Sequence, residues 1–193
     1  MNRGKLILII GPMKSGKSSE LMRMLRIRRV AKKRVYALRH LVVRGLHNEC
    51  DRLKSRDGSE PVEALDVANL REFSLEGIED AVIGVDEGQF FESHDLLAFC
   101  RTAVQQRNLV IVAALNGDSE GCMWPSISVL IPFCKEIKLF NAVCEFDGQD
   151  AQMTFRCDPG IEQIAVNAKY MPACEQCWDE QTTRKMAGIG FNY

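Results

Sequence analysis

The residues best suited to chemistry lie near the start of the chain, in a short segment that contains glycine. The segment from Gly11 to Ser18 fits the pattern G-x-x-x-x-G-K-[ST] and follows the apolar run from Leu6 to Ile10. In this pattern backbone N–H groups point at phosphate oxygens, the lysine reaches the β- and γ-phosphates, and the hydroxyl ligates Mg²⁺. We therefore expect a site for the phosphates of a nucleoside triphosphate, formed by Gly11, Pro12, Met13, Lys14, Ser15, Gly16, Lys17 and Ser18.

A pair of carboxylates follows a second apolar run. Asp86 and Glu87 come directly after the segment from Ala81 to Val85. The carboxyl end of such a strand is where enzymes with this phosphate loop place the carboxylate that serves Mg²⁺. Glu87 could accept a proton from a hydroxyl that attacks the γ-phosphate. The pair therefore predicts phosphoryl transfer, with Ser18 and Asp86 at the metal and Glu87 as the base.

Cysteine is frequent, and half of the eight cysteines lie after residue 140. Cys174 and Cys177 form a C-x-x-C pair, whereas the corresponding pair near Cys144 has an aspartate, Asp147, in its second position. The sequence shows no secretory signal, so clustered cysteines indicate a metal site rather than disulfides. We expect Zn²⁺ held by Cys144, Cys174, Cys177 and either Asp147 or Cys157, since carboxylate oxygen is an acceptable zinc ligand. Loss of the metal, with a lobe held by packing, is the alternative.

Apolar runs and helical patterns alternate through the first 140 residues. The expected strands cover 5–10, 34–38, 81–85, 109–115 and 136–140, and the expected helices cover 17–30, 93–107 and 126–133. Residues 62–73 form a weak helical or mixed stretch. Strands without polar alternation, separated by helices, indicate a parallel sheet covered on both faces. After residue 140 no apolar pattern of helical length remains, so we expect an α/β domain at 1–140 and a small cysteine-containing lobe at 141–193.

Composition restricts the partners. The net charge of −1 shows no general preference for nucleic acid, and the basic residues of the segment 23–34 lack interleaved aromatic residues. No apolar run approaches the roughly 18 residues that cross a bilayer. We therefore expect a soluble, cytoplasmic protein with neither a nucleic-acid nor a membrane partner.

These segments resemble those of a known family, the thymidine kinases of vertebrates, many bacteria and poxviruses. The phosphate loop continues as Ser19-Glu20-Leu21, and similar segments surround Leu115, Cys144 and Tyr170. The most specific segment is Asp86-Glu87-Gly88-Gln89-Phe90-Phe91. Nearly the whole chain is covered in the same order.

The resemblance implies a nucleotide-binding α/β core of the P-loop type, a small zinc-ribbon-like lobe, and a lasso loop that closes over the nucleoside. It implies transfer of the γ-phosphoryl group of ATP to the 5′-hydroxyl of thymidine or deoxyuridine, with Mg²⁺, usually by a homotetramer. It assigns Glu87 as general base and Asp57 as a supporting carboxylate. For the nucleoside it implies the residues Met13, Phe90, Leu115, Trp124, Thr154, Ile164, Val166 and Tyr170.

Several positions depart from the family pattern. Lys14 stands at a position that is usually apolar in the phosphate loop, and Ser119 stands where the family has an aromatic wall of the base pocket. The paired glycines of the lasso are replaced by Ala165-Val166-Asn167. These departures leave a second hypothesis open. The chain would then be a catalytically weak or inactive nucleotide-binding or oligomerisation domain, associated with an active homologous copy.

Overall fold

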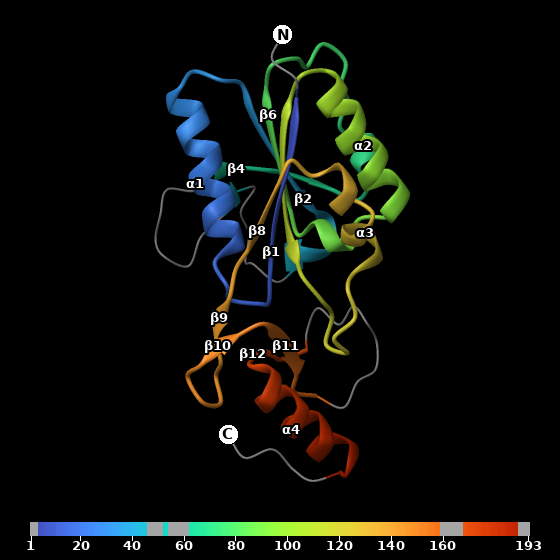
Figure 1. Ribbon diagram of the computed structural model, residues 1–193. Helices are drawn as coiled ribbons and strands as arrows, with labels where there is room; N and C mark the ends of the chain where they lie inside the picture. Colours follow the sequence, from blue (N-terminus) through green and yellow to red (C-terminus); the bar gives the residue numbers. More distant parts are fainter. Residues whose placement is uncertain (1–3, 46–51, 54–61, 159–167, 189–193) are drawn as a thin grey trace.

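A computed structural model describes residues 4–45, 52–53, 62–158 and 168–188 of the chain. A central sheet lies between helices on its two sides, and a smaller group of strands with one helix follows at one end of the sheet (Figure 1). The α/β architecture predicted from the alternating apolar runs is confirmed.

The central sheet has six strands in the order β5-β2-β6-β7-β1-β8. Every neighbouring pair is parallel. The strands are mostly continuous apolar runs because both faces of the sheet are covered and neither requires polar alternation. Their bounds are β1 Lys5–Gly11, β2 Val35–His40, β5 Leu65–Val67, β6 Val82–Asp86, β7 Leu109–Leu115 and β8 Glu136–Leu139.

Helices α1 (Lys17–Val30) and α2 (Ser93–Gln105) lie on opposite sides of the sheet (Figure 1). Leu21 and Leu25 of α1 pack against one face of the sheet, and Leu96 of α2 packs against the other. The short helix α3 (Pro125–Ser128) covers the same face as α2. None of the helices in the described ranges has both the length and the apolar character that a bilayer crossing requires.

The C-terminal lobe contains β9 (Ala142–Val143), β10 (Asp150–Ala151), β11 (Met153–Arg156), β12 (Tyr170–Ala173) and α4 (Glu175–Met186). Its buried residues form a cluster of their own, separate from the two clusters that face the central sheet. This separate cluster supports the predicted boundary near residue 140, which stays a prediction.

The connecting segments differ from the sequence-based expectations. Residues 62–73 form β4 (Val62–Glu63), which pairs with β3 (Arg52–Leu53), then β5, and the 3₁₀ turn η2 (Leu70–Glu72), with no α-helix. Of the helix expected at 126–133, α3 and the separate 3₁₀ turn η4 (Ile131–Phe133) are present, since Pro132 cannot donate a helical hydrogen bond. Helix α4 was not expected, because its buried side chains include a thiol and an amide, Cys177 and Gln181, rather than an apolar stripe.

Candidate active site

The topology brings the phosphate loop and the two carboxylates to one edge of the sheet. The loop follows β1, Asp86 ends β6, and Leu115 ends β7. These strands are adjacent and parallel in the order β6-β7-β1, so their carboxyl ends meet at the same edge. Crevices at this edge are the usual ligand sites of such sheets.

Glycine is required at two points of the phosphate loop. A Cβ atom at Gly11 would lie 2.4 Å from the carbonyl oxygen of Phe140 and 2.8 Å from Oγ of Ser15. Gly16 has φ of 86°, a left-handed conformation that favours glycine, and it caps the start of α1. The loop therefore turns tightly and presents its N–H groups beside the positive end of the helix dipole, as a phosphate site requires.

Lys17 is held inside this loop. Its Nζ donates to the carbonyl oxygen of Pro12 at 2.6 Å and lies 3.4 Å from Oγ of Ser15. Burial lowers the pKa of Lys17, while the nearby carboxylates of Glu87 and Asp86 oppose that shift. The ammonium group thus has loop oxygens as partners and lies where a triphosphate would compensate its burial.

Ser18 and Asp86 are direct neighbours. The Ser18 hydroxyl donates to Oδ1 of Asp86 at 3.1 Å, and the backbone N–H of Glu87 donates to the same oxygen at 3.1 Å. Burial, followed by the charge of Glu87, raises the pKa of Asp86 to about 7. A hydroxyl and a buried carboxylate side by side are oxygen ligands of the kind that Mg²⁺ takes, so this pair fits the metal expected there.

A hydrogen-bond network that the residue pattern does not predict orients the side chain of Glu87. Glu87 has φ of 54° and ψ of 43°, a left-handed conformation that is unusual for a residue with a side chain. Its Oε2 accepts a hydrogen bond from Nε2 of Gln89 at 2.5 Å. Oε1 of Gln89 in turn accepts from the backbone N–H of Leu115 at 3.1 Å. Gln89 is buried, so one amide joins the ends of β6 and β7 and orients the carboxylate.

Gln89 belongs to the family-specific segment, but its role depends on contacts made after folding. Its backbone carbonyl accepts a hydrogen bond from the Ser126 hydroxyl at 3.1 Å.

A buried ion pair was also not predicted. Arg39 contacts both carboxylate oxygens of Asp66, at 2.7 and 3.0 Å. Arg39 is also in register with Asp86. A charged residue next to the apolar run of this strand was the available signal for Arg39.

The structure brings together part of the predicted nucleoside pocket. The rings of Phe90 and Trp124 lie 6.0 Å apart between centroids, edge to face. The backbone N–H of Met13 donates to Oγ1 of Thr154 at 3.2 Å, which connects the phosphate loop to β11. Leu115 is half-buried at the end of β7.

One further predicted nucleoside residue, Tyr170, lies in the C-terminal lobe. Tyr170 opens β12, in register with Arg156, whose guanidinium carbon lies 6.0 Å from the tyrosine ring centroid. Asp57, Ile164 and Val166 lie outside the described residues.

The predicted metal ligands converge in the C-terminal lobe. One ligand atom from each of Cys144, Asp147, Cys174 and Cys177 lies within 4.8 Å of the others. The Cys174 thiol lies 3.3 Å from Oδ2 of Asp147, and thiol hydrogen bonds, foremost from Cys144, lower the pKa of Asp147 to about 2. Three thiols and one carboxylate fit a tetrahedral zinc site. Cys157 is buried in the lobe but is not part of this group.

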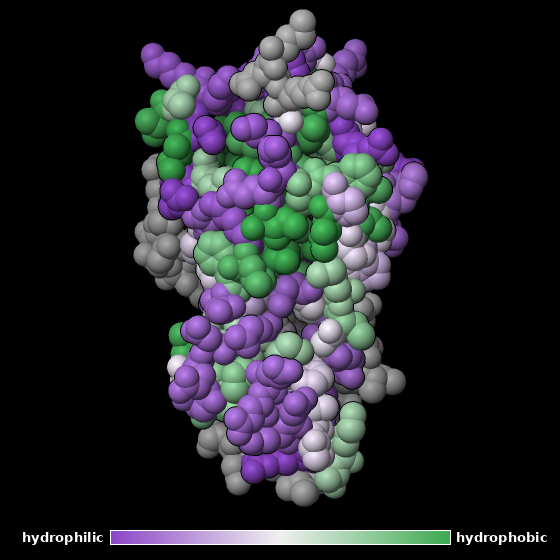
Figure 2. All heavy atoms as spheres, viewed as in Figure 1, coloured by the Kyte–Doolittle hydropathy of each residue, from purple (hydrophilic) through white to green (hydrophobic). Residues whose placement is uncertain are grey.

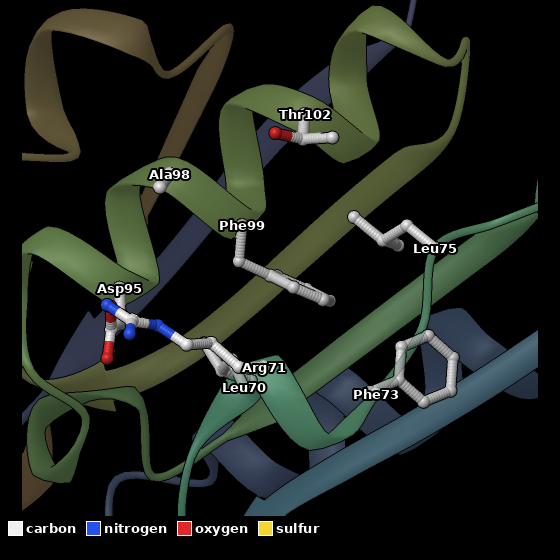
Figure 3. Close-up of a pocket in the computed structure, with 8 residues that line it drawn as sticks. All are labelled: Leu70, Arg71, Phe73, Leu75, Asp95, Ala98, Phe99 and Thr102. Atoms are coloured by element: carbon white, nitrogen blue, oxygen red, sulfur yellow. Dashed lines mark hydrogen bonds and ion pairs between the residues drawn. The ribbon is translucent and has the colours of Figure 1, made fainter.

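A cavity of about 240 Å³ lies elsewhere, between η2 and α2 (Figure 3). Phe73, Leu75 and Phe99 give it apolar walls, and Arg71 forms an ion pair with Asp95 at its side. No residue that lines this cavity belongs to the predicted site. The cavity therefore lies apart from the predicted phosphate and nucleoside residues.

Comparison with known proteins agrees with this geometry. A family model described as Thymidine kinase matches residues 4–178. The cytosolic thymidine kinase of Cricetulus griseus is 32% identical over 188 residues, which cover 96% of this chain and 78% of that protein. The thymidine kinase of Vaccinia virus (strain Ankara) is 35% identical over 181 residues, covering 92% of this chain and 98% of that protein.

A third relative comes from an insect virus. The thymidine kinase of Choristoneura biennis entomopoxvirus is 33% identical over 181 residues, covering 91% of this chain and 97% of that protein. The similarity therefore spans both the sheet and the C-terminal lobe.

Proposed function

Because the chain belongs to the thymidine kinase family, we propose that it transfers the γ-phosphoryl group of ATP to the 5′-hydroxyl of thymidine or deoxyuridine. The observation that carries this proposal is the Glu87 carboxylate, held by Gln89 at the strand end next to Asp86 and the phosphate loop. That arrangement provides a base, a metal-directed carboxylate and a phosphate site at one edge of the sheet.

At the phosphate end, backbone N–H groups of residues 14–18 and the ammonium group of Lys17 bind the triphosphate. The left-handed turn at Gly16 supports this role because it begins α1 directly after the loop. Ser18 and Asp86 would hold Mg²⁺, which when bound neutralises charge on the β- and γ-phosphate oxygens.

The acceptor hydroxyl requires a base. Glu87 accepts the proton of the 5′-hydroxyl while that oxygen forms a bond to the γ-phosphorus and the bond to the bridging oxygen of ADP breaks. The hydrogen bond from Gln89 keeps the Glu87 carboxylate in one orientation. Asp57 supports the site as a second carboxylate in this proposal.

For the nucleoside we propose walls from Met13, Phe90, Leu115 and Trp124. Such apolar and aromatic groups suit a thymine ring, whose polar edge takes hydrogen bonds from a few placed groups. Thr154, Tyr170 and the backbone near Ile164 and Val166 complete the proposed set. The edge-to-face contact of Phe90 with Trp124 supports it.

The same proposal includes Zn²⁺ on Cys144, Asp147, Cys174 and Cys177, where the metal supplies a structural crosslink to a lobe with a small core. It also includes a homotetramer, which the family resemblance suggests, and the cytoplasmic location expected from the sequence.

The test is product formation with a matched pair of variants. Purified protein is incubated with Mg·ATP and thymidine, and thymidine monophosphate is measured by mass spectrometry for wild type, Glu87→Gln and Glu92→Gln. Glu92 is exposed at the start of α2, and Glu92→Gln removes the same charge as Glu87→Gln. We expect product from wild type and Glu92→Gln, and a loss of about 100-fold or more in Glu87→Gln. Equal product from both variants would remove Glu87 from its role.

A second candidate is a nucleotide-binding domain without turnover. The observation that favours it is Ser119, which stands at the position of an aromatic wall and whose carbonyl oxygen accepts a hydrogen bond from Nε1 of Trp178 at 3.2 Å. Binding of ATP and thymidine to wild type without any product would select this candidate.

A further inference from the structure

The phosphate loop contacts the C-terminal lobe directly. Nζ of Lys14 forms an ion pair with Oε1 of Glu145, and the Met13 backbone donates to Thr154. The turn between β1 and α1 lies next to β9 and β10 of the lobe (Figure 1), and Figure 2 shows hydrophilic residues over the region where the two parts meet. Lys14 thus joins the sheet domain to the lobe.

Glu145 belongs to the metal-binding turn. It stands directly after Cys144 and two residues before Asp147, both of which contribute atoms to the cluster. Its backbone N–H donates to the carbonyl oxygen of Pro172 at 3.1 Å, and the N–H of Gly148 donates to that of Cys144 at 3.0 Å. The turn that carries Glu145 is therefore shaped by the same residues that surround the metal position.

On the other side, Lys14 lies at the tip of the phosphate loop. Its backbone has φ of 62°, in the left-handed region, so the loop adopts a conformation there that costs a residue with a side chain some free energy. An anchor on the Lys14 side chain favours this conformation over alternatives. Lys14 and Glu145 are each 35% exposed, so solvent screens the pair in part and its effect is small.

We propose that the Lys14–Glu145 ion pair couples the metal cluster to the phosphate loop, so that metal bound at the cluster strengthens triphosphate binding at the loop. Lys14 and Glu145 are positioning residues for that site, and the coupling rests on the ATP and zinc sites of the proposed function. By linkage, triphosphate bound at the loop must strengthen metal binding by the same factor.

Metal is expected to strengthen, rather than weaken, triphosphate binding because it restricts the turn that carries Glu145. Metal bound to Cys144 and Asp147 restricts the turn between them, so Glu145 has fewer positions and holds Lys14 at a lower entropic cost. The loop is then closer to its phosphate-binding shape before the nucleotide arrives. A partly exposed ion pair of this kind corresponds to a coupling of about threefold.

The first experiment measures the dissociation constant of Mg·ATP by calorimetry, with zinc-loaded protein and with protein from which zinc has been removed by a chelator and dialysis. Wild type, Glu145→Gln and the exposed control Glu180→Gln are compared. We expect metal removal to weaken ATP binding about threefold in wild type and in Glu180→Gln, and to have no effect in Glu145→Gln. An equal loss in Glu145→Gln, or no loss in wild type, would overturn the coupling.

A second experiment starts from zinc-loaded protein. The rate of zinc release to a chromophoric chelator is followed with and without Mg·ATP. We expect ATP to slow release about threefold in wild type and not in Glu145→Gln or Lys14→Met. Faster release with ATP would show the opposite sign and contradict the proposal. Absence of any ATP binding to zinc-loaded wild type would instead refute the proposed function on which the coupling rests.

Discussion

The two ends of the candidate site are built differently. At the phosphate end, Lys17 donates to the Pro12 carbonyl within the loop, and the Ser18 hydroxyl and the Glu87 N–H both donate to Asp86. At the nucleoside end, the predicted residues come from the phosphate loop, β7, η3 (Gly88–Phe90), the segment before α3, β11 and β12, and two of them lie outside the described ranges. The phosphate end thus depends mainly on one loop and one strand end, whereas the nucleoside end depends on how several elements meet.

This difference predicts how well each end tolerates substitutions. A loop that binds phosphate through its backbone has its shape set by glycines such as Gly11, where any Cβ would approach within 2.4 Å of the Phe140 oxygen. A pocket assembled from several side chains can lose one wall, such as the aromatic group that the family resemblance predicts at position 119, without a change of fold. We therefore expect mutations at the phosphate end to have the larger effects.

The largest effect is expected from Lys17→Met. It removes a buried ammonium group from the phosphate site, and loss of one partner of a buried charged contact costs about 2–5 kcal/mol. ATP affinity should fall by roughly 30-fold or more, as measured by calorimetry. Lys33→Met, at an exposed position after α1, should bind ATP as wild type does. Similar ATP affinity in the two variants would contradict the assignment of Lys17.

A second effect concerns stability and pH. Burial raises the pKa of Asp86 to about 7, so between about pH 4 and 7 the folded chain keeps a proton that the unfolded chain has released. Stability contributed by this group is therefore lost as pH rises through that interval. Asp86→Asn cannot ionise, so its free energy of unfolding relative to wild type should be about 2–4 kcal/mol higher at pH 8 than at pH 4.

Thermal unfolding of zinc-loaded protein without Mg²⁺ or nucleotide is the appropriate measurement, because Mg²⁺ bound at Asp86 would stabilise the ionised form. The same gain at both pH values would show that Asp86 is not the group responsible. A gain at pH 8 together with lost turnover would show that the phosphate end sacrifices stability for function.

A third variant tests the support behind the base. Gln89→Leu removes the hydrogen bonds to Glu87 and Leu115, and an unpaired buried group costs about 1–3 kcal/mol. We expect kcat to fall about tenfold or more with ATP affinity unchanged, whereas Gln105→Leu at the exposed end of α2 should retain wild-type kinetics. A loss of ATP affinity equal to the loss in kcat would indicate a general structural defect.

The smallest effect is expected at the nucleoside end. Ser119→Phe restores an aromatic side chain at the altered wall, and one aromatic contact is worth on the order of 1 kcal/mol. The KM for thymidine should fall by roughly fivefold while ATP affinity stays constant. Ser128→Phe, at an exposed position in α3, is the control. Unchanged thymidine kinetics in Ser119→Phe would place the base pocket elsewhere.

The parts of the fold that follow local patterns were predictable. Strands such as Leu109–Leu115 are long apolar runs, and α1 begins after a glycine that ends the phosphate loop. Helix α4 was not predictable by periodicity, because mostly polar residues form it and the Cys174 side chain caps its start by accepting from the Cys177 N–H. Its buried side chains, Cys177 and Gln181, form no apolar stripe that a helical period would reveal.

The candidate site shows the same division. The phosphate loop and Asp86 follow from residue types and spacing, because their geometry is set within one loop and one strand end. The roles of Gln89 and Glu145 did not follow, since each depends on a partner distant in the chain, at Leu115 and Lys14. Contacts across such separations arise from the topology, which spacing alone does not specify.

The most direct test is the dependence of ADP release on thymidine at saturating Mg·ATP. A chain with a complete phosphate end and an altered nucleoside end should bind ATP, release little ADP alone, and release ADP faster as thymidine is added, in equal amounts with thymidine monophosphate. ADP release that is the same with and without thymidine, in protein that binds ATP, would contradict the account of phosphoryl transfer to a nucleoside.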